Sequence, residues 1–220
     1  MKQKLDRVAI AMRVTREFKD GDVVNLGVGM PTLCSSYLPQ DRKVWLHAEN
    51  GVLGYGPFAE EGHQDPDLIN ASGQFVSSSP GISFFSSADA FNMIRGGHVD
   101  ISVLGGFQVS ERGDLANWIL PGRGSGNIGG AMELVTGAKK VIIAMEHTTR
   151  AGEPKLVAEC TYPLTGKGCV DLIVTDLAVV ALTEQGFLLL EIVHGFTPEE
   201  VQSVTGAPLA VSPDLREMEF

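Results

Sequence analysis

Short apolar runs of strand length that end directly in glycine recur along this chain of 220 residues. Residues 23–26 lead into Gly27, and residues 99–104 lead into Gly105 and Gly106. Glycine after a strand lets the backbone turn sharply or approach another group closely. These runs alternate with segments of helical periodicity, which predicts an α/β fold with a central mixed, largely parallel sheet flanked by helices.

The periodicity and the turn residues place the individual elements. Helices are predicted over residues 2–19, 31–38, 88–94 and 198–205, with a short one from residue 131. Strands are predicted over residues 23–26, 44–46, 52–53, 99–104, 115–120, 141–145, 156–160, 169–175, 178–182 and 187–193. Residues 58–87 are rich in Gly, Ser, Pro and acids, and we expect a long irregular segment there. No linker composition divides the chain, so one domain over residues 1–220 is predicted.

Composition excludes several classes of protein. The formal net charge is −10 and basic residues do not cluster, which argues against binding to nucleic acid or to an anionic membrane. The three cysteines follow no disulfide or zinc spacing, so we expect reduced thiols. The N-terminus has no apolar run typical of a signal peptide, and no run is long enough to cross a membrane. A cytoplasmic protein is expected.

One carboxylate stands at a position suited to chemistry. In the stretch V-W-L-H-A-E-N-G-V-L-G-Y-G-P, residues 44–57, Glu49 ends an apolar strand and the Asn50-Gly51 turn follows it. Ligands and catalytic groups of α/β sheets gather at strand ends and in the loops that follow them. Glu49 is therefore a candidate catalytic residue, although the same pattern fits a hairpin whose acid faces solvent.

Two glycine-rich loops could hold a ligand. Gly27-Val28-Gly29 lies between a strand and a helix, an arrangement that suits an anion but also occurs in tight turns without a ligand. Gly124-x-Gly126-x-x-Gly129 has the spacing of a dinucleotide fingerprint, with Glu146 about 20 residues on. A dinucleotide-dependent oxidoreductase is thus one alternative. Another is a non-catalytic module that binds acyl-CoA or sugar phosphate, with Glu49 only hydrogen-bonded to the ligand.

Other common chemistries lack their residues. There is no G-x-S-x-G motif for a serine hydrolase, and the five histidines have no metal-ligand spacing, so no metal site is predicted. A carboxylate can itself be the nucleophile in covalent catalysis. An acyl group attacked by Glu49 would need donors for the developing oxyanion, which Gly105, Gly106 or Asn50 could supply.

The chain resembles the β subunits of the 3-oxoacid CoA-transferases (family I). The resemblance is carried, in chain order, by Gly27-x-Gly29-x-Pro31, Ala48-Glu49-Asn50-Gly51, Arg95-Gly96-Gly97-His98-Val99-Asp100, Val103-Leu104-Gly105-Gly106-Phe107-Gln108-Val109, Gly113-Asp114-Leu115-Ala116-Asn117-Trp118, Gly129-Gly130-Ala131-Met132 and Pro163-Leu164-Thr165-Gly166. Residues 155–166 and 175–179 look most like the 3-oxoadipate (β-ketoadipate):succinyl-CoA version. Ala48 stands where the family usually has serine.

The resemblance implies a function and a set of site residues. It implies ping-pong transfer of CoA from succinyl-CoA to a 3-oxoacid, with 3-oxoadipate favoured over acetoacetate or acetate as acceptor. Glu49 would carry a glutamyl-CoA thioester, so CoA is substrate and covalent intermediate, and no cofactor is bound permanently. It also implies a separate α subunit, in a heterodimer or heterotetramer. By similarity, the backbone of Gly105 or Gly106 would be the oxyanion donor, and Gly27, Val28 and Gly29 with Arg123 would lie along CoA. Asn50 is kept as a further candidate catalytic residue, and Gly129 and Gly130 as further candidates for binding CoA.

Overall fold

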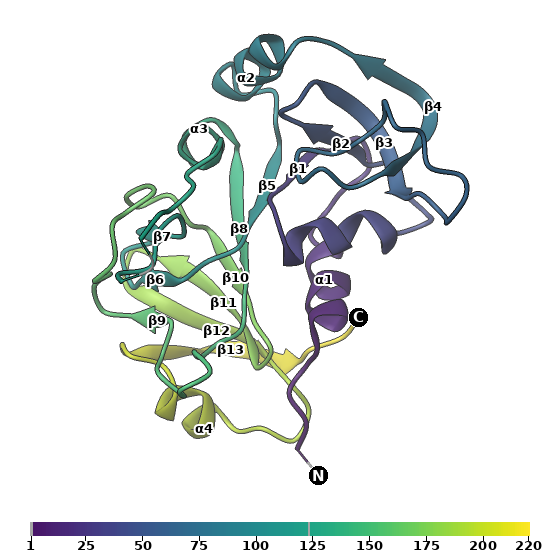
Figure 1. Cartoon of the computed structure of the whole chain (residues 1–220). Coiled ribbons are helices and arrows are strands. Elements are labelled where there is room, and N and C mark those ends of the chain that lie inside the picture. The colour runs from purple at the N-terminus through teal and green to yellow at the C-terminus, as the bar shows by residue number, and fades with distance from the viewer. Residues whose placement is uncertain (1, 123) are drawn as a thin grey trace.

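The computed structural model describes residues 2–122 and 124–220 (Figure 1). Arg123, expected beside CoA, lies outside the described residues. Ten strands form one sheet, and in the order in which they lie side by side they are β13 (Leu209–Glu217), β12 (Gly186–Ile192), β11 (Ala178–Thr183), β10 (Leu172–Val174), β8 (Lys140–Ala144), β5 (Ile101–Leu104), β1 (Val23–Leu26), β2 (Trp45–Ala48), β3 (Val52–Phe58) and β4 (Val76–Phe84). Five of the nine pairings are parallel, and β10, β8, β5, β1 and β2 form a continuous parallel centre. The predicted mixed, largely parallel sheet is confirmed.

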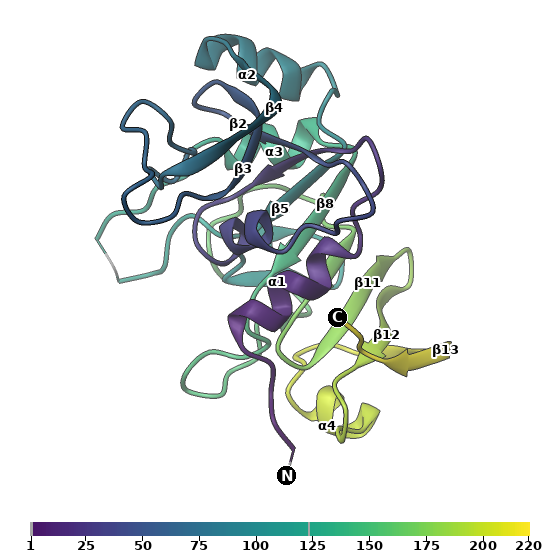
Figure 2. The same cartoon turned by 90° about the vertical axis from the view of Figure 1, so that its right-hand side faces the viewer.

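The remaining elements cover this sheet. The helices are α1 (Arg7–Thr15), the 3-10 helix η1 (Met30–Ser36), α2 (Ser87–Arg95), α3 (Ala131–Gly137) and α4 (Pro198–Ser203). A small second sheet contains β7 (Leu115–Ala116), β6 (Gln108–Ser110) and β9 (Leu156–Val157). Figure 2 shows α1 lying across the large sheet. No helix within residues 2–122 and 124–220 has both the length and the apolar character needed to cross a membrane.

The core has two layers because side chains alternate across the central strands. In β8, Ile142 belongs to the apolar cluster that includes Val14 of α1, whereas Ile143 belongs to the cluster that includes Leu134 of α3. Both isoleucines are fully buried. Central strands covered on both faces are typical of parallel sheets, and they appear in the sequence as continuous apolar runs.

Several elements differ from the sequence-based predictions. The strands predicted over residues 115–120 and 156–160 are only two residues long, as β7 and β9. The first helix spans Arg7–Thr15 rather than residues 2–19, because the Asp6 side chain caps it by accepting a hydrogen bond from the Ala9 N–H at 2.8 Å. Residues 76–84 form β4 instead of an irregular segment, and β13 was not predicted at all. Both are outermost strands that contain a proline, at Pro80 and Pro213, which an edge position tolerates.

The order of the parallel strands creates a crevice at their carboxyl ends. From β1 the chain goes on through η1 to β2 on one side of β1, and it returns later to β5 on the other side. Loops that leave adjacent strands in opposite directions leave a gap where ligands of α/β proteins bind. Gly27 follows β1, Glu49 follows β2 and Gly105 follows β5, so these residues are brought to one edge of the sheet.

Candidate active site

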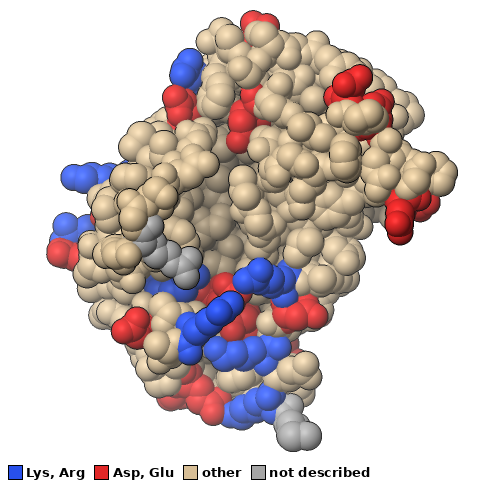
Figure 3. All heavy atoms as spheres, in the orientation of Figure 1, with Lys and Arg blue, Asp and Glu red and all other residues tan. Residues whose placement is uncertain are grey.

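A cavity of about 470 Å³ opens at this edge of the sheet. Figure 3 shows the molecule hollowed at the centre of the corresponding face, with Lys, Arg, Asp and Glu side chains gathered along the lower border of the hollow. The cavity is lined by most of the residues predicted from the sequence, namely Gly27, Val28, Gly29, Glu49, Gly105, Gly106, Gly129 and Gly130. Segments that are far apart in the sequence therefore contribute to one site.

Glu49 lies in the cavity and is held by a hydrogen bond from Asn25. Its side chain is half-buried, and Oε2 accepts a hydrogen bond from Nδ2 of Asn25 at 3.0 Å. Within the described part of the chain, no cation lies within ion-pair distance of this carboxylate. The interpretation of Glu49 as a hairpin acid that faces open solvent is therefore wrong. A carboxylate that is held in one orientation, and whose charge no cation neutralises, can attack a carbonyl carbon as a nucleophile.

A buried polar pair stands behind Glu49. Asn25 pairs in register with His47 on the neighbouring parallel strand, and the two side chains are 0% and 1% exposed. Nδ2 of Asn25 lies 3.1 Å from Nδ1 of His47. Because an amide nitrogen can only donate, Nδ1 accepts and the ring proton lies on Nε2. His47 thus helps to orient the amide that holds Glu49. The sequence signal for Asn25 is a polar residue within an otherwise apolar strand.

The burial of His47 predicts a pH dependence of stability. Burial lowers the pKa of His47 to about 4, below the value of about 6.5 expected in the unfolded chain. The neutral ring therefore contributes stability that is fully present above pH 6.5 and is lost as the pH falls toward 4, by about 3 kcal/mol. A His47→Gln variant, whose side-chain oxygen can still accept from Asn25, should lose correspondingly less stability between pH 7 and pH 4. Urea unfolding at several pH values measures this difference, and parallel curves for the two proteins would refute it.

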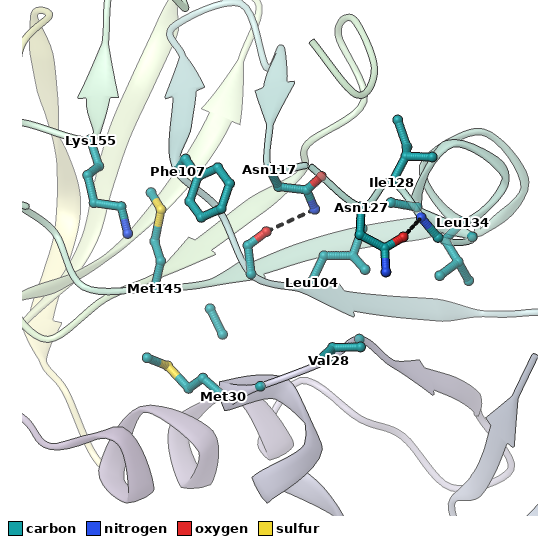
Figure 4. A pocket seen from close by; sticks show the side chains of 18 of the residues that line it. Val28, Met30, Leu104, Phe107, Asn117, Asn127, Ile128, Leu134, Met145 and Lys155 are labelled. Atoms are coloured by element: carbon teal, nitrogen blue, oxygen red, sulfur yellow. Dashed lines mark hydrogen bonds between the residues drawn. The ribbon is translucent and has the colours of Figure 1, made fainter. Parts of the chain in front are cut away.

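Gly105 and Gly106 present backbone N–H groups at the cavity wall. Among the described residues, neither glycine donates its N–H to another group. The Gly105 carbonyl accepts a hydrogen bond from Nδ2 of Asn117 at 3.1 Å, which is drawn in Figure 4 and holds the loop in place. A Cβ at Gly106 would lie 2.9 Å from Sδ of Met145, so only glycine lets this loop approach the end of β8 so closely. The geometry suits the predicted oxyanion donors, whose role remains a prediction.

Asn50 does not join the site. Its side chain is exposed, and its amide donates to the Ile69 carbonyl at 2.8 Å. It is not among the residues that line the cavity. Residues 49–51 form the turn after β2, so the side chain of Asn50 need not point the same way as that of Glu49. Its side-chain amide instead holds the segment at Ile69, and a part for Asn50 in the chemistry stays a prediction.

The loops predicted to bind CoA line the cavity, but some of their N–H groups already donate hydrogen bonds within the protein. The Gly27 N–H donates to the Val103 carbonyl at 2.8 Å, and the Gly129 N–H donates to Oδ1 of Asn127 at 3.0 Å. A Cβ at Gly130 would lie 3.8 Å from Cγ of Glu49, so this backbone lies beside the carboxylate. Binding of CoA along these loops stays a prediction, as does any part played by Arg123.

The dinucleotide fingerprint lacks its structural context. Such a loop must follow a strand and open a helix that packs on the same sheet. Here residues 124–130 lie outside helices and strands, the preceding β7 is a two-residue strand of the small sheet, and α3 has only seven residues. The alternative of a dinucleotide site at Gly124–Gly129 is therefore set aside.

The sequence prediction missed one end of the cavity. The residues that line it there are Arg7, Phe107, Met145, Glu146 and Lys155. Figure 4 shows Phe107, Met145 and Lys155 close together at this end. They come from four separate segments, so no local motif unites them. This end combines apolar surface with charged side chains.

Comparison with known proteins identifies the family. The model of the coenzyme A transferase family matches residues 7–203. The chain is 51% identical over 208 residues to the B subunit of the 3-oxoadipate CoA-transferase of Pseudomonas putida, covering 94% of this chain and 97% of that protein. It is 48% identical to the mitochondrial succinyl-CoA:3-ketoacid coenzyme A transferase 2A of Rattus norvegicus, covering 97% of this chain and 41% of that protein.

Solved structures agree in fold. An acyl-CoA transferase from Escherichia coli O157:H7 superposes with a TM-score of 0.76 at 22% identity, over 98% of this chain and 44% of that one. Glutaconate coenzyme A-transferase from Acidaminococcus fermentans gives a TM-score of 0.70 at 18% identity, over 99% of this chain and 91% of that one. The family match covers far more than half of the chain, including the ends of β1, β2 and β5 that form the cavity. The chain belongs to the coenzyme A transferase family.

Proposed function

We propose that this chain is the catalytic subunit of a two-chain enzyme that transfers CoA from succinyl-CoA to a 3-oxoacid, with 3-oxoadipate as the preferred acceptor. The observation that carries the proposal is Glu49, a half-buried carboxylate without an ion-pair partner among the described residues, in a cavity beside the backbone of Gly105 and Gly106.

The proposed reaction proceeds by covalent catalysis on Glu49. A carboxylate oxygen attacks the thioester carbonyl of succinyl-CoA, the carbon–sulfur bond breaks, and CoA leaves as a thiolate, giving an acyl anhydride. The thiolate then attacks the Glu49 carbonyl carbon, the anhydride carbon–oxygen bond breaks, and succinate leaves. The resulting glutamyl-CoA thioester reacts with the incoming acid by the same steps in reverse. The energy of the thioester is conserved because a carboxylate, not water, accepts the acyl group.

Each attack places negative charge on a carbonyl oxygen. A preorganised N–H donor to such an oxyanion lowers the barrier by about 3 kcal/mol. The N–H groups of Gly105 and Gly106 are free within the described residues and line the same cavity as Glu49. We assign them to this role, with the hydrogen bond from Asn25 holding the carboxylate in the orientation for attack.

The acceptor is proposed from the relatives. The B subunits of two 3-oxoadipate CoA-transferases are 51% and 49% identical to this chain and are covered almost completely. The B subunit of a probable succinyl-CoA:3-ketoacid coenzyme A transferase from Bacillus subtilis is 48% identical, which favours acetoacetate as the second candidate acceptor.

A partner subunit is part of the proposal. These bacterial relatives are each named as one subunit of an enzyme, and this chain spans only 41% of the rat enzyme. A separate α subunit, in a heterodimer or heterotetramer, would supply the remaining part of the site. The proposed compartment is the cytoplasm, in keeping with three free cysteines.

An acceptor comparison tests this function. The chain co-expressed with the α subunit should consume succinyl-CoA with 3-oxoadipate at a higher kcat/KM than with acetoacetate, and with acetate lowest. Each subunit purified alone is the control and should show no transfer. A preference for acetoacetate would support the second candidate acceptor, and the absence of transfer to any of the three acids would contradict the proposal.

A further inference from the structure

A buried lysine lies at the end of the cavity away from Glu49. Lys155 is 9% exposed and lines both the cavity that contains Glu49 and an adjoining one of about 380 Å³. Figure 4 shows its side chain pointing into the cavity, near Phe107 and Met145. Within residues 2–122 and 124–220, its Nζ takes part in no ion pair. Burying an unpaired ammonium is costly, and burial lowers the pKa of Lys155 accordingly.

The acids near Lys155 are already paired with other cations. Glu146 accepts from Arg7 at 3.0 Å, and Asp176 lies 3.2 Å from Nζ of Lys4. Of the described cations that line the cavity of Glu49, Arg7 is therefore paired and Lys155 is not. An anion that enters this cavity would find the ammonium of Lys155 available as a partner.

The backbone holds Lys155 firmly. Its N–H donates to the His147 carbonyl at 3.1 Å, and its carbonyl accepts from the Val109 N–H at 2.9 Å. These two bonds fix the residue between the end of β8 and strand β6, directly before β9. Because hydrogen bonds hold the backbone of Lys155 in place, its cation is preorganised to bind a ligand at one position.

We propose that Lys155 binds the remote carboxylate of the acyl group, so that this end of the cavity selects acids with a second carboxylate. The inference rests on the proposed function and specifies its substrate class. Glu49 follows β2, and Lys155 is bonded to His147 shortly after the end of β8; three strand spacings, about 14 Å, separate β2 from β8. Both residues line the same cavity, so a short dicarboxylic chain is proposed to lie between them. The apolar surface of Phe107 and Met145 would contact its methylene groups.

A carboxylate and the phosphates of CoA are the two anions to consider as ligands of Lys155. One unpaired ammonium matches one carboxylate in charge. The adjoining cavity is lined by Lys4, Arg7 and Arg150 as well as by Glu146 and Asp176, so its charge alone does not distinguish the two ligands.

The first half-reaction, in which enzyme–CoA forms from an acyl-CoA without any acceptor, shows whether Lys155 binds a carboxylate of the acyl group or a phosphate of CoA. The rate of enzyme–CoA formation is measured for the co-expressed pair with succinyl-CoA and with acetoacetyl-CoA, which carry the same CoA but differ in the second carboxylate. In Lys155→Met we expect the second-order rate with succinyl-CoA to fall roughly 10- to 100-fold, because a charge-assisted hydrogen bond is lost. The rate with acetoacetyl-CoA should change less than about threefold. Lys155→Arg should recover part of the loss, and Lys167→Gln, at an exposed lysine, should behave as wild type.

Three results would overturn the inference. They are equal losses with both thioesters, a succinyl-CoA rate in Lys155→Met within about threefold of wild type, and loss of binding to the α subunit, which would assign Lys155 to the interface. Thermal unfolding of each variant checks that the fold is retained. If the wild-type pair forms no enzyme–CoA with either thioester, the proposed function itself fails, so the two failures are distinguishable.

Discussion

Replacing Glu49 by glutamine should reduce CoA transfer by roughly 10⁴-fold or more, because an amide oxygen cannot serve as the nucleophile that forms the anhydride. Glutamine has nearly the same shape and keeps an oxygen that can accept the hydrogen bond from Asn25. Stability should therefore change by less than about 1 kcal/mol. Steady-state transfer from succinyl-CoA by the co-expressed pair measures the effect.

The matched control is Glu184→Gln, at an exposed residue in the turn between β11 and β12. This variant should transfer CoA at the wild-type rate. A Glu49→Gln pair with activity within about tenfold of wild type would contradict the assignment of Glu49 as the nucleophile.

Replacing Gly51 by alanine should destabilise the protein by about 3 to 5 kcal/mol. Gly51 has φ of +112°, a conformation that costs an alanine energy, and a Cβ there would lie only 2.0 Å from the Phe85 carbonyl oxygen. That oxygen belongs to backbone, and the Phe85 N–H donates to the Gly51 carbonyl at 3.0 Å, so neither segment can move independently. Because Gly51 lies two residues after Glu49, the fraction that folds should also transfer CoA poorly.

The Gly62→Ala variant separates the cost of a positive φ from the cost of the contact with the Phe85 carbonyl oxygen. Gly62 has φ of +82°, but a Cβ there would meet nothing within 4 Å. The cost should be only the conformational one, about 1 kcal/mol. Urea unfolding followed by far-UV circular dichroism measures both variants, and equal destabilisation would show that the contact with Phe85 is unimportant.

Local sequence patterns predicted much of the fold. The strand at residues 23–26 agrees with β1 at both ends, because a short apolar run bounded by Asp22 and Gly27 is unambiguous. The turn at Asn50-Gly51 indeed joins the antiparallel β2 and β3. The helix after Thr197 also appears as predicted, with its capping box formed. In each case the signal lies within a few consecutive residues.

The parts that could not be predicted depend on contacts between distant segments. Strands β4 and β13 have weak propensity, and they form because β3 and β12 offer unpaired edges. The contact between Asn25 and His47 depends on the parallel register of β1 and β2. Lys155 reaches the cavity only through the small sheet that β9 forms with β6. The spacing of residues within one segment gives no information about contacts between segments that are far apart in the sequence.

For Glu49, too, the local features could be predicted from the sequence and the contacts with distant segments could not. The strand and turn around Glu49 are local features, so its position at a strand end could be predicted. Whether it faces solvent or a cavity depends on β5 and on the loop before α3, which lie about 55 and 80 residues further along the chain. The side chain of Asn50 could not be placed for the same reason, since its partner Ile69 lies in another segment.

Mass spectrometry of the enzyme after exposure to succinyl-CoA tests the central claim most directly. The co-expressed pair is incubated with succinyl-CoA and no acceptor, then digested and sequenced. CoA should be attached as a thioester to the peptide that contains Glu49, and this adduct should disappear when 3-oxoadipate is added. A pair that transfers CoA while the adduct is absent, or is found on another residue, would contradict the assignment of Glu49 as the nucleophile.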